Sequence, residues 1–91
     1  MVTKGKKKGT IRFAVKPTGE ARSVQLAGDF QSWKPVPMRK TKDGSFEAEV
    51  PLLAGKHQYK FIIDEQWVPD PDNTLSTPNS YGTTNSVAQV D

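Results

Sequence analysis

The sequence predicts an all-β protein, folded as a small antiparallel β-sandwich of about seven short strands. Apolar and polar residues alternate with period two along most of the 91 residues, and no stretch repeats with the period of a helix. Turn-forming glycine, proline, asparagine and aspartate residues interrupt this alternation at short intervals. The composition, 34% hydrophobic and 25% charged, suits strands that each show one face to water.

The N-terminal half contains two regular strands. Residues 11–16 place Ile11, Phe13 and Val15 on one face, with polar or small residues between them. A turn follows, and a second strand is expected over residues 24–27, ended by glycine and aspartate.

The middle of the chain is punctuated by proline and glycine. Residues 33–37 contain two prolines, so we expect a loop there, with a short edge strand over residues 38–40. The Asp-Gly pair at residues 43–44 lies between two strand-like segments, which is a strong hairpin signal. The next strand is expected over residues 45–50.

The most regular strand of the sequence is expected over residues 57–64, with aromatic and aliphatic side chains on one face and Lys60 on the other. Residues 69–81 are rich in Pro, Asp, Asn, Ser and Thr and are expected to form a loop. Structureless connections of this length in a small domain are often functional. A last strand over residues 85–90 closes the predicted sheet.

The positive charge of the chain is concentrated at its beginning. Residues 1–9 are expected to form a flexible basic tail, followed by a single β-sandwich domain over residues 10–91. Four of the thirteen basic residues lie in that tail; the other nine face ten acidic residues, so the net charge of +3 belongs to the tail. A tail of this kind binds nucleic acid or anionic lipid only weakly. We therefore expect neither of them as a partner.

Several protein classes are excluded by composition. The chain has no cysteine, which rules out disulfides, thiolate catalysis and zinc–thiolate sites. No apolar run is long enough to span a membrane, and no apolar stretch follows the first lysines as in a secretory signal. We expect a cytoplasmic protein or module that needs no cofactor and no metal. Without an obvious apolar patch, it is expected to be a monomer.

Candidates for catalysis are few. The only histidine, His57, begins a strand, where a partly buried packing role is expected. Residues 70–73 resemble a calcium loop but lack the glycine and distal glutamate of an EF-hand, and turn formation explains them better. Asp64 and Glu65 are neighbours at a hairpin tip and cannot hold two carboxyls across a sugar. We do not expect an enzyme.

The two tryptophans are the most informative residues for function. Trp33 and Trp67 each lie beside a turn, where an indole can be partly exposed. An exposed flat ring suits stacking on the apolar face of a sugar, and Lys60 and the Asn/Thr-rich C-terminal end supply hydroxyl-binding groups. Core packing is the alternative for each tryptophan, and stacking on single-stranded nucleic acid is a weaker third interpretation.

The order and spacing of several motifs resemble a known family. Gly28-Asp29-Phe30 leads to Trp33, residues 55–61 read Gly-Lys-His-Gln-Tyr-Lys-Phe, residues 64–67 read Asp-Glu-Gln-Trp, and residues 82–85 read Gly-Thr-Thr-Asn. With Asp70-Pro71, these motifs cover about three-quarters of the chain, from residue 24 to residue 90. The chain thereby resembles the glycogen- and starch-binding modules of carbohydrate-binding module family 48. That resemblance implies an immunoglobulin-like sandwich of the early-set type.

The resemblance also implies a set of carbohydrate-binding residues. Trp33 and Trp67 match the family's sugar-stacking tryptophans, and Lys60 matches its hydroxyl-binding lysine. Near the C-terminal end, the matching positions are Tyr81, Thr83 and Asn85. Tyr81 is a departure, because a leucine stands there in the kinase-associated members of the family, and the loop before it is one residue longer here.

From these residues we expect non-catalytic binding of α-1,4-linked glucans such as glycogen, starch, maltooligosaccharides and cyclodextrin. The module would tether a partner or parent protein to polysaccharide, with a kinase or a glucan-processing enzyme as the protein partner implied by the family. The alternative is a structural or protein-interaction sandwich that does not bind sugar.

Overall fold

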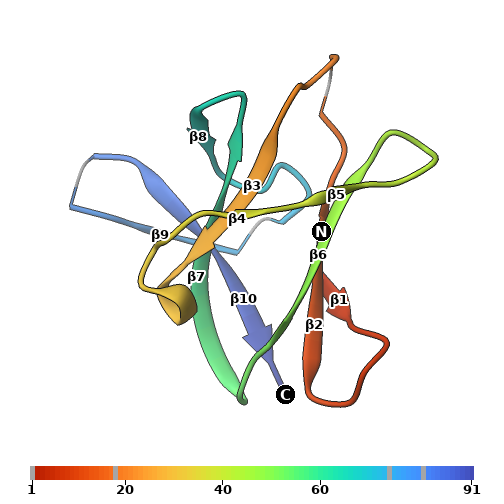
Figure 1. The fold of residues 1–91 in the computed structure, drawn as a ribbon. Coiled ribbons are helices and arrows are strands. Elements are labelled where there is room, and N and C mark those ends of the chain that lie inside the picture. Colours follow the sequence, from red (N-terminus) through yellow and green to blue (C-terminus); the bar gives the residue numbers. More distant parts are fainter. Residues whose placement is uncertain (1, 18, 74, 81) are drawn as a thin grey trace.

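The computed structural model describes residues 2–17, 19–73, 75–80 and 82–91, and it confirms the predicted all-β antiparallel sandwich. One sheet has the strand order β1-β2-β6-β5, and the other has the order β4-β3-β7-β10-β9, with β8 paired to β7 (Figure 1). The strands are β1 (Val2–Lys4), β2 (Thr10–Val15), β3 (Val24–Gly28), β4 (Val36–Pro37), β5 (Arg39–Lys40), β6 (Phe46–Pro51), β7 (Gly55–Ile63), β8 (Gln66–Val68), β9 (Ser76–Pro78) and β10 (Thr84–Val90). A short 3₁₀ helix, η1 (Asp29–Gln31), follows β3. The described residues hold no helix with the length and apolarity needed to cross a membrane.

The core lies between the two sheets and is formed by the apolar faces that the alternation predicts. Phe13 of β2 and Tyr59 and Phe61 of β7 are completely buried. The ring of Phe13 meets Tyr59 edge-on, with centroids 4.8 Å apart, and stacks on Phe30 of η1 at 5.7 Å. Aromatic pairs in these arrangements add to the free energy of area burial. The core therefore joins both sheets to η1.

Strand β7 organises the second sheet because it has three partners. One edge pairs with β3 along residues 59–63. The other edge pairs with β10 along residues 55–59 and then with β8 along residues 61–63. Lys60 lies at the point where this second edge passes from β10 to β8.

The β7–β8 hairpin has a tight two-residue turn. Asp64 and Glu65 have φ of 48° and 72°, and positive φ at both central residues is the signature of a type I′ turn. The Oδ1 atom of Asp64 accepts hydrogen bonds from the backbone N–H groups of Arg22 and Ser23, at 2.8 and 3.0 Å. These bonds tie the hairpin, and hence Trp67, to the chain that enters β3.

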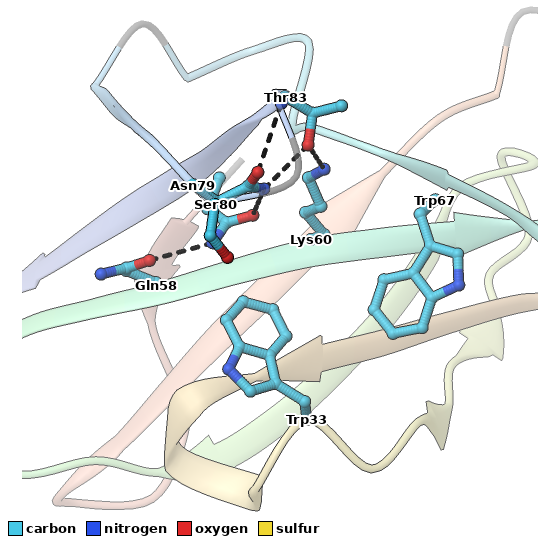
Figure 2. A pocket seen from close by; sticks show the side chains of 8 residues that line it. Trp33, Gln58, Lys60, Trp67, Asn79, Ser80 and Thr83 are labelled. Carbon is cyan, nitrogen blue, oxygen red and sulfur yellow. Dashed lines mark hydrogen bonds between the residues drawn. The ribbon is translucent and has the colours of Figure 1, made fainter.

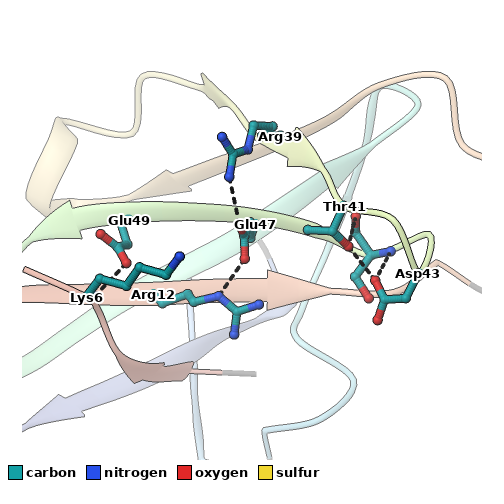
Figure 3. Close-up of polar contacts among 8 residues, drawn as sticks. Lys6, Arg12, Arg39, Thr41, Asp43, Glu47 and Glu49 are labelled. Carbon is teal, nitrogen blue, oxygen red and sulfur yellow. Dashed lines mark hydrogen bonds and ion pairs between the residues drawn. The ribbon is translucent and has the colours of Figure 1, made fainter.

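The described residues of the segment over residues 1–9, for which the sequence predicts a flexible basic tail, include a short strand. Val2–Lys4 forms β1 and pairs with β2, and Val2 packs against the core. The turn that follows is closed by a 2.9 Å bond from the N–H of Gly5 to the carbonyl of Thr10, and the N–H of Lys6 donates to Glu49 (Figure 3). Backbone pairing and the packing of Val2 thus connect the start of this basic segment to the first sheet.

Charged side chains line the outer face of the first sheet (Figure 3). Glu47 of β6 accepts from Arg12 at 2.6 Å and from Arg39 at 3.3 Å. The hydrogen bond from Arg12 lowers the pKa of Glu47. In the neighbouring turn, hydrogen bonds from Thr41 and Ser45 hold the pKa of Asp43 at about 2. This carboxylate accepts bonds within the turn, and the flanking strands β5 and β6 pair as the Asp-Gly hairpin signal predicts.

The described residues between 69 and 80 include a short strand where the sequence predicts a loop over residues 69–81. This strand, β9, pairs with β10, and Asp70, near the start of the segment, is 3% exposed. The hydroxyl of Tyr59 donates to Asp70 Oδ2 at 2.7 Å, and Asn73 Nδ2 donates to the same hydroxyl at 2.9 Å. Burial, together with the bond to Asp70, raises the pKa of Tyr59. The turn-forming role expected for residues 70–73 is present, since Asp72 N–H donates to Asp70 Oδ1.

Replacing Tyr59 by phenylalanine is expected to lower the free energy of unfolding by about 1–3 kcal/mol, because Asp70 and Asn73 each lose a buried partner. Urea denaturation of the wild type and of Tyr59→Phe measures this difference. A change below about 0.5 kcal/mol would show that water replaces the hydroxyl without cost and that the other hydrogen bonds of Asp70 and Asn73 suffice to hold the segment.

Candidate functional site

The second sheet carries an open cleft of about 650 Å³ on its outer face (Figure 2). We call it the indole cleft, and its lining residues are Trp33, Gln58, Lys60, Trp67, Asn79, Ser80, Thr83 and Asn85. The cleft brings together five of the six residues that the sequence singled out. The sixth, Tyr81, lies outside the described residues.

Trp33 reaches the cleft because the chain turns sharply after β3. Ser32 and Trp33 both have positive φ, 54° and 59°, and the N–H of Trp33 donates to the carbonyl of Gly28 at 2.9 Å. A Cβ atom on Gly28 would lie 2.3 Å from the Phe30 ring and 2.9 Å from the Gln58 carbonyl oxygen, so only glycine allows this close approach. Trp33 is half-buried and lies outside the buried core cluster.

Trp67 enters the cleft from the opposite edge of β7. It lies in β8 directly across from Ile62, and it is 48% exposed. Figure 2 shows both indole rings on one side of Lys60, while Thr83 and Asn79 lie on the other side. The two tryptophans are therefore cleft residues, and neither belongs to the core.

Lys60 is buried where its position on an outward strand face predicts exposure. It is 7% exposed, and its Nζ atom donates to Thr83 Oγ1 at 3.0 Å. The side chain lies beneath the loop that carries Thr83, at the junction of β10 and β8. Among the described residues, no carboxylate forms an ion pair with this ammonium.

Amides and a hydroxyl continue from Lys60 along one side of the cleft. We call this group the polar wall, and it consists of Gln58, Lys60, Asn79, Thr83 and Asn85. Asn79 Nδ2 donates to Thr83 Oγ1 at 2.8 Å and to Asn85 Oδ1 at 3.0 Å, and Asn85 Nδ2 donates to Gln58 Oε1 at 2.9 Å. Asn85 is 7% exposed. Three lining residues, Gln58, Asn79 and Ser80, were not predicted as site residues.

His57 takes the packing role that the sequence predicts. Its Nε2 atom lies 2.8 Å from the carbonyl oxygen of Leu53, and its ring meets Phe30 edge-on at 6.0 Å. Its Nδ1 atom is 3.9 Å from Asp29, so the ring bridges the β6–β7 turn and η1. In the described part of the chain, no group of three or more His, Cys, Asp or Glu side chains is placed to hold a metal ion.

The fold and the cleft together define a small ligand-binding β-sandwich module, with aromatic rings on one side of the cleft and hydrogen-bonding groups on the other. A family model described as the glycogen recognition site of AMP-activated protein kinase matches residues 11–91. The chain belongs to this family. The resemblance expected from the motifs is thereby confirmed.

Relatives that match most of this chain are subunits of a kinase. The chain is 40% identical over 73 residues to 5'-AMP-activated protein kinase subunit beta-1 of Bos taurus, covering 80% of this chain and 26% of that one. It is 36% identical over 92 residues to the human subunit beta-2, covering 88% of this chain and 33% of that one. The chain thus spans about a quarter to a third of the length of these relatives.

Solved structures of two amylases contain a similar fold. A putative alpha amylase from Salmonella typhimurium matches with a TM-score of 0.72 and 25% identity, covering 97% of this chain and 14% of that one. A maltogenic amylase from S. marinus matches with a TM-score of 0.74 and 24% identity, covering 90% of this chain and 13% of that one. At this level of identity, the similarity to the maltogenic amylase concerns the fold alone.

Proposed function

We propose that this chain is a non-catalytic module that binds α-1,4-linked glucans through the indole cleft. The observation that carries the proposal is the meeting of two partly exposed indoles and a hydrogen-bonding wall in one open cleft. The description of the matching family as a glycogen recognition site supports the same ligand class.

The aromatic and the polar residues of the cleft have different roles in the proposed binding. Trp33 and Trp67 stack on the apolar faces of glucose units, because flat rings bury such faces at low entropic cost. Lys60, Thr83 and Asn85 hydrogen-bond the sugar hydroxyls. Tyr81, proposed from the sequence, adds an aromatic group with a hydroxyl to the loop that bounds the cleft.

The lining of the cleft suits binding rather than hydrolysis. Glycoside hydrolysis needs two carboxyl groups that flank the scissile bond. The described lining residues are tryptophans, amides, hydroxyls and one lysine, and none of them carries a carboxyl group. We therefore propose a tethering role, in which the module holds a kinase or a glucan-processing enzyme on the polysaccharide.

Weak binding of short sugars is compatible with this role. We expect dissociation constants between about 1 μM and 1 mM for short oligosaccharides, or about −4 to −8 kcal/mol. Simultaneous binding of several modules to one polymer strengthens attachment without any new contact.

Titration of tryptophan fluorescence with β-cyclodextrin tests the proposal. A saturable change with β-cyclodextrin, and none with cellohexaose, would establish an α-glucan-binding module. No response at millimolar sugar would reject it and leave the alternative, a structural or protein-interaction sandwich.

Replacing Lys60 by methionine is expected to weaken β-cyclodextrin binding about tenfold, because the buried ammonium supplies charged hydrogen bonds worth about 1.5–3 kcal/mol. Lys56→Met is the matched control, since Lys56 lies exposed on the same strand and does not line the cleft. Equal affinities of the two variants, measured by the same titration, would remove Lys60 from the proposed site.

A further inference from the structure

We propose that Asn79 is a positioning residue that sets the hydrogen-bonding direction of the whole polar wall, so that the wall presents mainly donors to the ligand. The proposal rests on the proposed function and deepens it, because it states which kind of ligand atom the wall recognises. Asn79 lies in the loop between β9 and β10, and its role comes from three hydrogen bonds within the protein.

The direction originates at two groups that can only donate. The ammonium of Lys60 donates to Thr83 Oγ1, and the backbone N–H of Thr83 donates to Asn79 Oδ1 at 3.2 Å. The ammonium cannot accept a hydrogen bond, so Thr83 Oγ1 must be the acceptor in its bond with Lys60. The backbone N–H of Thr83 cannot accept either, so the oxygen of the Asn79 amide must face it. Its Nδ2 atom then faces the other way and donates to Thr83 Oγ1 and Asn85 Oδ1.

The orientation passes along the wall from amide to amide. With its oxygen engaged by Asn79, Asn85 turns its Nδ2 atom to Gln58 Oε1. The oxygen of Gln58 accepts this bond from Asn85, so the amide nitrogen of Gln58 is left to donate to a ligand. Among the described residues, Asn79 Nδ2 is the donor that holds Asn85 Oδ1, so its loss would release the amide orientations of Asn85 and Gln58.

The wall therefore meets a ligand chiefly with donors. Thr83 Oγ1 already accepts from Lys60 and Asn79, so its hydroxyl proton is left to donate. Lys60 has ammonium protons beyond the one bonded to Thr83, and Gln58 has its amide nitrogen. The class of ligand atom that fits is an oxygen acting as acceptor, which is a role that a sugar hydroxyl can take at several positions around one glucose.

The test compares two substitutions that add the same charge. Asn79→Asp keeps an oxygen for the Thr83 backbone but loses both donated bonds. Thr84→Asp is the matched control, because Thr84 lies exposed between Thr83 and Asn85 and does not line the cleft. We expect Asn79→Asp to bind β-cyclodextrin about tenfold more weakly than Thr84→Asp, with both variants measured at a temperature where thermal unfolding shows them to be fully folded. Equal affinities would overturn the proposal.

A pH series distinguishes positioning from a structural role. A protonated aspartate can donate again, so the affinity of Asn79→Asp should recover as the pH falls below about 4. Asn79→Ala has no group to protonate and should not recover relative to the wild type at the same pH. Recovery of neither variant, or of both, would overturn the proposal.

The wild type supplies a readout that needs neither sugar nor a variant. The two side-chain amide protons of Asn79 both form hydrogen bonds within the protein. They should therefore exchange with solvent at least about tenfold more slowly than those of exposed Gln89. Exchange as fast as that of Gln89 would overturn the inference. If β-cyclodextrin fails to bind the wild type, the proposed function fails, and slow exchange would still support the positioning role of Asn79.

Discussion

Trp67→Ala is expected to weaken binding of β-cyclodextrin about a hundredfold. Trp67 is 48% exposed, so roughly 100 Å² of its ring remains to be covered by a ligand. At about 25 cal/mol per Å², covering it contributes about 2.5 kcal/mol, or nearly two decades in the dissociation constant. Trp33 is more buried, and Trp33→Ala is expected to reduce affinity in the same direction.

The measurement is the fluorescence titration, with calorimetry for variants whose signal is lost with the indole. Leu53→Ala is the control, because Leu53 is a large apolar residue that is 84% exposed and lies outside the cleft lining. Thermal unfolding checks that the β7–β8 hairpin survives the loss of the ring. If Trp67→Ala and Leu53→Ala bind the sugar equally, the ring does not stack on it.

Phe13→Ala is expected to lower the free energy of unfolding by about 3–5 kcal/mol. The ring is completely buried and contacts the rings of Tyr59 and Phe30, so its removal leaves a cavity where the two sheets and η1 meet. A domain of this length has a total stability of about 5–14 kcal/mol, so the variant keeps only part of it. Loss of support for Phe30 should also loosen the turn that places Trp33.

Chemical denaturation measures this loss, and Phe13→Leu is the comparison that keeps most of the apolar volume. We expect Phe13→Leu to lose less than about 1.5 kcal/mol. A loss below about 1 kcal/mol for Phe13→Ala would mean that the neighbouring rings collapse into the space, and that the junction is less rigid than the ring geometry indicates.

The fold was largely predictable because period-two alternation reports directly which face of a strand is buried. The faces formed by Ile11, Phe13 and Val15 and by Tyr59 and Phe61 are the core. Short elements were harder to predict: β1, β8 and β9 have three residues each, too few for alternation to show. Their existence depends on backbone pairing with a neighbouring strand, which is a tertiary property.

The candidate site was predicted in part. Exposed indoles beside turns, together with the family motifs, identified Trp33 and Trp67, and the cleft contains both. The burial of Lys60 could not be read from its outward position, because a loop more than twenty residues later in the sequence covers it. Asn79 gave no signal in the sequence, since its contribution depends on the positions of Thr83 and Asn85 in space.

The change of partners along β7 has a consequence for selectivity. Trp33 comes from the β3 side of this strand and Trp67 from β8 on the other side, so the separation of the two rings is set by backbone pairing across β7. The sheet therefore holds the two rings at a fixed span through main-chain hydrogen bonds between β3, β7 and β8. If the proposed function holds, we expect a glucan whose curvature brings consecutive glucose faces to that span to bind without deforming the protein. A straighter chain would have to bend to reach both rings, and the free energy of that bending would weaken its binding.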